Sequence, residues 1–231
     1  KKEGFTISTR GNMTTVTGND GSGVIYGCRE LIDHVGQYKD LKFPAQLTDA
    51  PEMVLRGGCV GIQKMEYLPG RGVYEYPYTP ESFPWFYDKE QWIKYLDMLV
   101  ENRMNSLYLW NGHPFASLVK LEEYPFAVEV DEETFKKNEE MFSFLTAEAD
   151  KRGIFVIQMF YNILLSKPFA EHYGLKTQDR NRPITPLVSD YTRKSVAAFI
   201  EKYPNVGLLV CLGEAMDTYE DDVEWLSLIH I

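Results

Sequence analysis

The stretch Asn102-Arg-Met-Asn-Ser-Leu-Tyr-Leu-Trp-Asn111 joins a short polar turn to an apolar run that ends in Trp-Asn. The run has the length of a buried strand. In the segment before it, apolar side chains recur at helical spacing, at Trp92, Tyr95, Leu96, Leu99 and Val100. The stretch therefore predicts an amphipathic helix, a tight turn and a strand.

The same unit recurs along the chain. Apolar runs predict four strands, at Leu55 to Ile62, Asn105 to Trp110, Ile154 to Tyr161 and Val206 to Leu212. Two further helices are indicated by Phe135, Phe142, Leu145 and Ala149, and by Val196, Phe199 and Ile200. Because a parallel neighbour needs a crossover connection, this alternation of strands and helices predicts a parallel sheet.

The connections differ in length in a consistent way. Helix-to-strand links are tight, at 102–105, 151–153 and 203–205, whereas strand-to-helix links are long, at 63–88, 111–131 and 162–191. Long loops after the strands are typical of a (β/α)8 barrel, whose active site lies at the carboxyl ends of the strands. Gly57-Gly-Cys-Val-Gly61 does not match the dinucleotide-binding pattern G-x-G-x-x-G, which disfavours a doubly wound fold.

The residues before the first barrel strand predict a smaller domain. Phe5 to Ile7 and Thr14 to Val16 read as a hairpin, and a helix that stops at Gly36 follows it. We expect an α/β chain with a small N-terminal α/β domain at 1–44, a linker at 42–51, and the first half of a (β/α)8 TIM barrel at 52–225. Residues 226–231 resemble translated sequencing-adapter read-through and are a possible non-native tail; an ordinary end of a strand or helix is the alternative.

Composition excludes several classes of protein. The 231 residues are 44% hydrophobic, which is enough for a folded core, and the formal net charge is -10 without a long basic cluster, which disfavours nucleic acid as a partner. No apolar run has the length of a membrane span. Cys28, Cys59 and Cys211 lack the spacing of a zinc site or a disulfide framework, so we expect these cysteines to be small residues of the core. We expect neither a metal ion nor a cofactor. The acidic residues from Glu214 to Glu224 lack the pattern of a calcium loop.

Polar and aromatic residues at the strand ends are the candidates for the functional site, because such residues point into the mouth of a barrel. Glu214 follows the fourth strand, where a carboxyl group with a raised pKa would serve as a general acid; a structural ion pair with Arg56 or Arg193 is the alternative. His113 is either a site residue or a packed loop residue. Aromatic residues of the first long loop either stack on sugars or pack over the mouth. Candidate substrate-binding residues are Arg56, Trp110, Asn111, His113, Tyr161 and Asn162.

Three motifs carry a family resemblance. The stretch from Gly18-Asn-Asp-Gly-Ser-Gly to Leu31, the segment Leu47-Thr-Asp-Ala-Pro51 and the triplet Leu55-Arg-Gly57 resemble the small domain, and its junction to the barrel, of β-hexosaminidase-like and α-glucuronidase-like glycoside hydrolases. Asn102 to Trp110 and Gly213-Glu214 are similar to the second and fourth barrel strands of the same superfamily. The resemblance covers the chain to about residue 220.

The resemblance implies an exo-acting glycoside hydrolase on an oligosaccharide or glycan terminus, with release of a uronic acid as one expected reaction. It implies Glu214 as the general acid, Arg56 as a ligand of sugar hydroxyls, and a secreted or periplasmic location. Gly213 stands where β-hexosaminidases carry an Asp, which favours the α-glucuronidase-like interpretation. Alternatives are a β-N-acetylhexosaminidase, a non-catalytic carbohydrate-binding protein and, with less support, a lyase or isomerase. A glycosidase usually needs two carboxyl groups, and the sequence indicates only Glu214.

Overall fold

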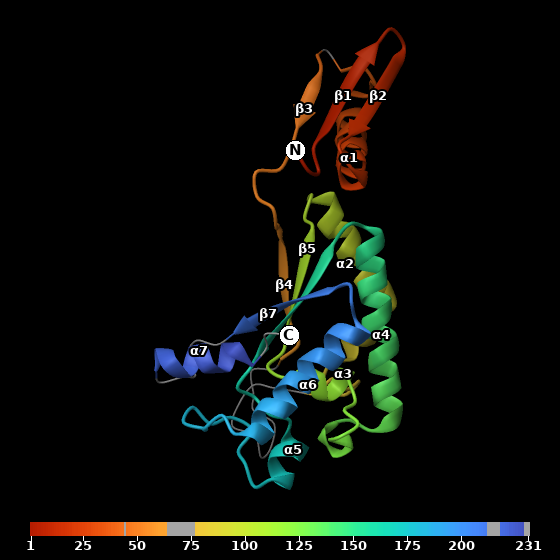
Figure 1. Ribbon diagram of the computed structural model, residues 1–231. Coiled ribbons are helices and arrows are strands. Elements are labelled where there is room, and N and C mark those ends of the chain that lie inside the picture. The colour runs from red at the N-terminus through yellow and green to blue at the C-terminus, as the bar shows by residue number, and fades with distance from the viewer. Residues whose placement is uncertain (44, 64–76, 212–217, 229–231) are drawn as a thin grey trace. The chain divides into compact units, whose positions relative to one another are not determined.

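The computed structural model describes residues 1–43, 45–63, 77–211 and 218–228. It is a mixed α/β structure with a small antiparallel sheet and a four-stranded sheet (Figure 1). The predicted fold class is confirmed. The chain divides into two compact units. Unit 1 comprises Lys1–Gly58, Ile93–Ser106 and Glu148–Ile154, and unit 2 comprises Cys59–Trp92, Leu107–Ala147 and Phe155–Ile231.

Unit 1 contains the small sheet, with strand order β2-β1-β3. Strands β1 (Phe5–Arg10) and β2 (Met13–Gly18) form the predicted hairpin, and β3 (Leu47–Asp49) pairs antiparallel with β1. Helix α1 (Gly21–Tyr38) packs against this sheet around Phe5, Ile7 and Tyr26 (Figure 1).

Two expectations for unit 1 are wrong. The residues interpreted as a linker include β3, because Leu47 pairs with Ile7 at the sheet edge. Helix α1 does not stop at Gly36. It continues to Tyr38 and ends at Lys39, whose φ of 57° lies in the left-handed region and whose N–H donates to the carbonyl of Val35 at 2.9 Å.

The parallel sheet has strand order β4-β5-β6-β7. Its strands are β4 (Gly57–Gly61), β5 (Ser106–Trp110), β6 (Phe155–Tyr161) and β7 (Val206–Cys211). Val156 pairs with Val206 and Tyr161 with Cys211, which fixes a parallel register for β6 and β7. The four predicted strands are confirmed to within two residues at the described ends.

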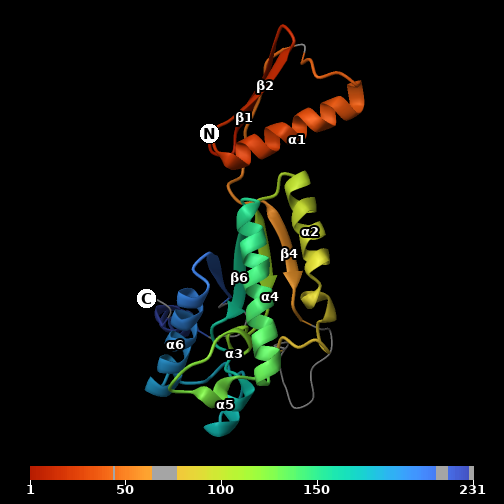
Figure 2. The ribbon, with the colours of Figure 1, turned by 90° about the vertical axis from the view of Figure 1, so that its right-hand side faces the viewer.

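Helices α2 (Lys89–Glu101), α4 (Glu132–Lys151) and α6 (Pro186–Lys202) connect the strands, as predicted. Figure 2 shows α4 running alongside β6. Short elements occupy the long loops: η1 (Pro84–Tyr87), α3 (Phe115–Leu118), η2 (Pro125–Ala127) and α5 (Lys167–His172). Helix α7 (Tyr219–Ser227) follows β7 and brings Trp225, which is fully buried, into a cluster with Leu228. No described helix is long and apolar enough to cross a membrane.

The two helix-to-strand turns of unit 1, after α2 and after α4, have the same backbone conformation. After α2, Arg103 takes a φ of 54°, and Met104 N–H donates to the carbonyl of Leu99 at 2.8 Å. After α4, Gly153 takes a φ of 68°, and the N–H of Ile154 donates to the carbonyl of Ala149 at 2.9 Å. A left-handed residue that closes the last turn in this way satisfies carbonyl groups at the helix end. The chain then enters β5 or β6 directly.

A buried polar network holds the residues before β4 and β5. The Asn105 Nδ2 atom donates to both carboxylate oxygens of Glu3, at 2.9 and 3.1 Å, and to the carbonyl of Val54. The Asn105 Oδ1 atom accepts from the N–H of Arg56 at 2.8 Å. Arg56 Nη1 lies 3.0 Å from the Glu3 carboxylate. These hydrogen bonds give Asn105 a structural role.

Buried aromatic side chains fill much of unit 2. In the first long loop Tyr78, Phe83 and Phe86 are buried, and Tyr78 makes edge-to-face contacts with both phenylalanines. These residues pack, as one of the two interpretations of the loop holds. Tyr67, Tyr74 and Tyr76 lie outside the described residues.

The cysteines do not behave as expected. Cys28 and Cys59 are exposed and Cys211 is half-buried. In α1 the buried face is formed by Gly23, Tyr26 and Gly27, which places Cys28 outside it. Along β4 exposure alternates, and Cys59 lies on the more exposed side with Gly57 and Gly61. The expectation of small core residues is therefore wrong for Cys28 and Cys59.

Candidate functional site

Two aromatic residues end neighbouring strands of the parallel sheet. Trp110 is the last residue of β5 and Tyr161 the last of β6, and their ring centroids lie 6.4 Å apart at 44°. Both side chains are half-buried. The N–H of Tyr161 donates to the carbonyl of Gly112 at 3.0 Å, which ties the two strand ends together. The structure thus brings these two predicted site residues to one edge of the sheet.

Asn111 is fully buried directly after Trp110. Its Nδ2 donates to the carbonyl of Ile62 at 2.9 Å, and its Oδ1 accepts from the N–H of His113 at 2.9 Å. Its side chain therefore fixes the end of β4 and the loop after β5. A direct contact of Asn111 with substrate stays a prediction.

Asn162 follows Tyr161 and is 2% exposed. Neither its Oδ1 nor its Nδ2 has a hydrogen-bond partner within the described part of the chain. The buried Nε1 of Trp110 also lacks a hydrogen-bond partner there. A buried amide without a partner costs on the order of 1–3 kcal/mol. A catalytic or ligand-binding role is one explanation for such a group. Asn162 follows Tyr161 directly in sequence, and both Asn162 and Trp110 carry buried polar atoms without a partner in the described part of the chain.

His113 lies deeper in unit 2. It is 6% exposed, and its Nε2 lies 2.8 Å from the hydroxyl of Tyr191 in α6. Its ring also meets Phe115 edge to face. Burial raises the pKa of Tyr191 to about 12, so the phenol is neutral at physiological pH. The geometry is that of a packed loop histidine, the other interpretation of the sequence, and substrate binding by His113 stays a prediction.

Arg56 is not at the carboxyl edge. It directly precedes β4, at the amino end of that strand, and belongs to unit 1. Its guanidinium contacts Glu3, the carbonyls of Arg103 and Met53, and the ring of Tyr26. The residue before a strand lies at the opposite end from the residues that follow strands, and binding of sugar hydroxyls by Arg56 stays a prediction. Its observed contacts are structural.

Glu214, the expected general acid, lies outside the described residues. The structure therefore brings together Trp110, Asn111, Tyr161 and Asn162, and Glu214 stays a prediction. In the described part of the chain no group of three or more His, Cys, Asp or Glu side chains is placed to hold a metal ion.

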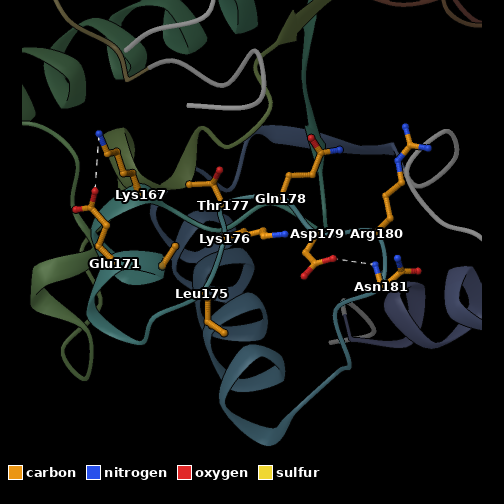
Figure 3. Close-up of a pocket in the computed structure, with 10 residues that line it drawn as sticks. Lys167, Glu171, Leu175, Lys176, Thr177, Gln178, Asp179, Arg180 and Asn181 are labelled. Atoms are coloured by element: carbon orange, nitrogen blue, oxygen red, sulfur yellow. Dashed lines mark hydrogen bonds and ion pairs between the residues drawn. The ribbon is translucent and has the colours of Figure 1, made fainter. Parts of the chain in front are cut away.

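Sequence reasoning missed a pocket in the segment between β6 and α6. It has a volume of 690 Å³ and is lined by α5 and residues 175–181 (Figure 3). The segment is anchored near the end of β6, because Leu165 N–H donates to the carbonyl of Thr177 at 3.0 Å. The only signal in the sequence is the grouping of Lys176, Arg180 and Arg182 in an acidic chain.

No family model matches the chain, and no curated protein matches it. Among solved structures, the chain is similar to a GH138 enzyme targeting pectin rhamnogalacturonan II, with 79% sequence identity and a TM-score of 0.95. The match covers 98% of this chain and 26% of that one, so the chain spans about a quarter of that enzyme.

Two more distant structures share the fold alone. A GH20 exo β-N-acetylglucosaminidase from Vibrio harveyi has a TM-score of 0.58 at 11% identity, and the match covers 98% of this chain and 38% of that one. A β-N-acetylhexosaminidase from Bacteroides fragilis has a TM-score of 0.55 at 16% identity, over 88% of this chain and 41% of that one. Nearly the whole chain is thus similar in sequence and in structure to one stretch of a pectin-targeting GH138 enzyme.

Proposed function

We propose that the chain is part of a glycoside hydrolase that acts on a pectic glycan. The observation that carries the proposal is the group of residues at the ends of β5 and β6. There Trp110 and Tyr161 present rings 6.4 Å apart, and the buried amide of Asn162 has no partner within the described residues. Sugars bind by stacking on aromatic rings and by hydrogen bonds from their hydroxyls to fixed polar groups.

The similarity to the GH138 enzyme supports the same conclusion. Identity of 79% is high enough for the two chains to share side chains as well as backbone, and that enzyme targets pectin rhamnogalacturonan II. The two acetylhexosaminidases, at 11% and 16% identity, support only the fold. We therefore prefer a pectic substrate to an N-acetylhexosamine.

We further propose exo-action with release of a uronic acid, with Glu214 as the general acid. Glu214 follows β7, the next strand after β6, and residues at this edge of a barrel meet the substrate. A protonated carboxyl group there would deliver its proton to the glycosidic oxygen. A secreted or periplasmic location, which the family resemblance implies, is part of the same proposal.

The test is hydrolysis of rhamnogalacturonan II by the natural full-length protein, followed by chromatography of the released sugars. We expect the wild type to release a monosaccharide, and Glu214→Gln to lose at least about a hundredfold in kcat, as expected when general acid catalysis is removed. Glu220→Gln, which removes an acid from the first turn of α7, is the matched control and should keep wild-type activity.

Three results would contradict the proposal in different ways. Binding of the glycan without turnover by the wild type would favour a carbohydrate-binding protein. Full activity of Glu214→Gln would remove Glu214 from the mechanism. Oligosaccharide products in place of a monosaccharide would exclude exo-action. Asn162→Ala provides a separate check on the edge of the sheet, since it should raise KM without unfolding the protein.

A further inference from the structure

The pocket between β6 and α6 is distinct in composition from the strand-end residues. Basic side chains line it at Lys167, Lys176 and Arg180, and acidic ones at Glu171 and Asp179. In Figure 3, Lys167 and Glu171 lie at one end of the pocket, and Arg180 and Asn181 lie at the other. The three remaining polar residues of the lining are uncharged: Thr177, Gln178 and Asn181.

The charges of this lining are unevenly matched. Glu171 lies 3.8 Å from the Nζ of Lys167, and the Oδ1 of Asp179 accepts from the N–H of Asn181 at 3.1 Å. Within the described residues, the exposed side chains of Lys176 and Arg180 have no carboxylate partner. Elsewhere in unit 2, Lys89, Lys120, Lys137, Lys194 and Lys202 each pair with a glutamate. In a chain of net charge -10, unmatched basic side chains around one pocket favour an anionic ligand.

A buried arginine holds the pocket wall in place. Arg182 is 6% exposed, and its guanidinium donates to the carbonyl of Ile163 at 3.0 Å and to the carbonyl of Lys176. Burial lowers the pKa of Arg182 to about 10, and the nearby Asp179 opposes that shift, so the group stays protonated at neutral pH. Arg182 therefore holds the carbonyl of Lys176 near the end of β6, which reduces the ordering that is needed when a ligand binds.

We propose that this pocket binds carboxylate groups of an acidic polysaccharide at sugar residues beyond the bond that is cleaved. Arg180 and Lys176 would pair with carboxylates, and Thr177, Gln178 and Asn181 would meet sugar hydroxyls. Glu171 and Asp179 disfavour a densely charged ligand such as a polyphosphate, whereas single carboxylates spaced along a sugar chain avoid them. The inference rests on the proposed function for its substrate class, but it concerns a different set of residues.

The test is a calorimetric titration of the natural full-length protein carrying Glu214→Gln, so that turnover does not complicate binding. The probes are tetragalacturonate and its full methyl ester, which has the same sugar chain without the negative charges. We expect Lys176→Ala combined with Arg180→Ala to weaken binding of the acid about tenfold or more. Lys136→Ala is the matched control, because Lys136 is exposed on α4 and should not change affinity.

The outcomes separate this inference from the proposed function. Equal affinity for the acid and its ester, or unchanged affinity in the double variant, would overturn the proposal that the pocket binds carboxylates. Neither result would contradict the proposed hydrolysis. Arg180-dependent binding of the acid by a protein that hydrolyses no glycan would overturn the proposed function and leave the pocket standing. Arg180→Lys adds a further check, since retained charge should restore part of the affinity. A melting curve confirms that each variant is folded.

Discussion

The Nε2 atom of His113 and the hydroxyl oxygen of Tyr191 lie 2.8 Å apart, although 78 residues separate them in sequence. Their rings are nearly parallel, with centroids 5.9 Å apart. Both residues are buried, and Tyr191 also stacks on Phe169 at 3.9 Å between centroids. The hydrogen bond therefore joins the loop after β5 to α6 within unit 2, and it sets the position of the histidine.

Tyr191→Phe tests this bond. The substitution keeps the ring and its stacking but removes the hydroxyl, so we expect a loss of about 1 kcal/mol in the free energy of unfolding, measured with urea. Tyr219→Phe is the control, because the Tyr219 side chain is exposed and its hydroxyl should not matter. If His113 contacts substrate, Tyr191→Phe should also raise KM. An unchanged KM would assign the pair to stability alone.

Asn138 in α4 is a second buried polar side chain whose contribution to stability can be measured. Its Nδ2 donates to the carbonyls of Tyr78 and Ser117, at 2.9 and 3.1 Å, and its Oδ1 accepts from the Tyr87 hydroxyl at 2.5 Å. Asn138→Ala leaves two carbonyls and a phenol buried without this partner. We expect a loss of about 3 kcal/mol or more in the free energy of unfolding. Asn205→Ala, at an exposed position, should change it by less than about 0.5 kcal/mol.

Gly153 and Gly174 form a matched pair of left-handed glycines. Both have positive φ, of 68° and 65°. A Cβ atom on Gly153 would lie 2.5 Å from the Ser22 Oγ, whereas one on Gly174 would meet nothing within 4 Å. Gly174→Ala should cost about 1–2 kcal/mol through the backbone alone, and Gly153→Ala should cost more. In a Ser22→Ala background the two glycine substitutions should lower the free energy of unfolding by similar amounts. Equal costs without that background would show that the side chain at Ser22 simply moves away.

Asp20 gives the small domain a dependence on pH. It caps α1 by accepting from the N–H of Gly23 at 2.8 Å, and it accepts from the N–H of Glu3 at 2.8 Å. The backbone hydrogen bond from Glu3, followed by that from Gly23, lowers the pKa of Asp20 below its ordinary value of 3.8. Because the folded pKa is depressed, the stabilisation is complete above pH 3.8 and is lost as the pH falls through the folded pKa.

We therefore expect Asp20→Ala to lower the free energy of unfolding by about 1 kcal/mol at neutral pH, and by less in acid. Unfolding curves recorded from neutral pH to below pH 3.8 measure the difference. Asp20→Asn keeps a capping oxygen without the charge, so its own contribution should not vary over this range. A wild-type advantage that stays constant in acid would contradict the role of the charge.

Much of the fold follows from the sequence because its units are local. The turn before β5 and the turn before β6 each combine a helix end with a left-handed residue, and the apolar runs behind them are short enough to be strands. Strand β3 could not be predicted in this way. It has three residues, and only its pairing with Ile7, 40 residues earlier, makes Leu47 part of a sheet.

The candidate site also combines features that follow from local sequence with features that depend on contacts between distant residues. The sequence places Trp110 and Tyr161 at the ends of two successive strands and predicts that both point into the mouth of the barrel; in the structure their rings lie close together. Arg56 lies directly before β4, and the sequence does not show on which side of that boundary the residue falls, so a contact of Arg56 with sugar hydroxyls stays a prediction. The pocket beside α5 depends on how residues 175–181 fold back, and this is set by Arg182 and two carbonyls. No local pattern records such contacts.

The bond between Glu3 and Asn105 spans 102 residues and has a consequence for the order of events during synthesis. When Glu3 leaves the ribosome, its buried partner has not yet been made. At typical elongation rates of about 5–20 residues per second, several seconds pass before Asn105 follows. In that interval the carboxylate of Glu3 remains hydrated, because the hydrogen bonds from Asn105 cannot yet form. Unit 1 also contains Glu148–Ile154, so it can be completed only after translation has passed Ile154.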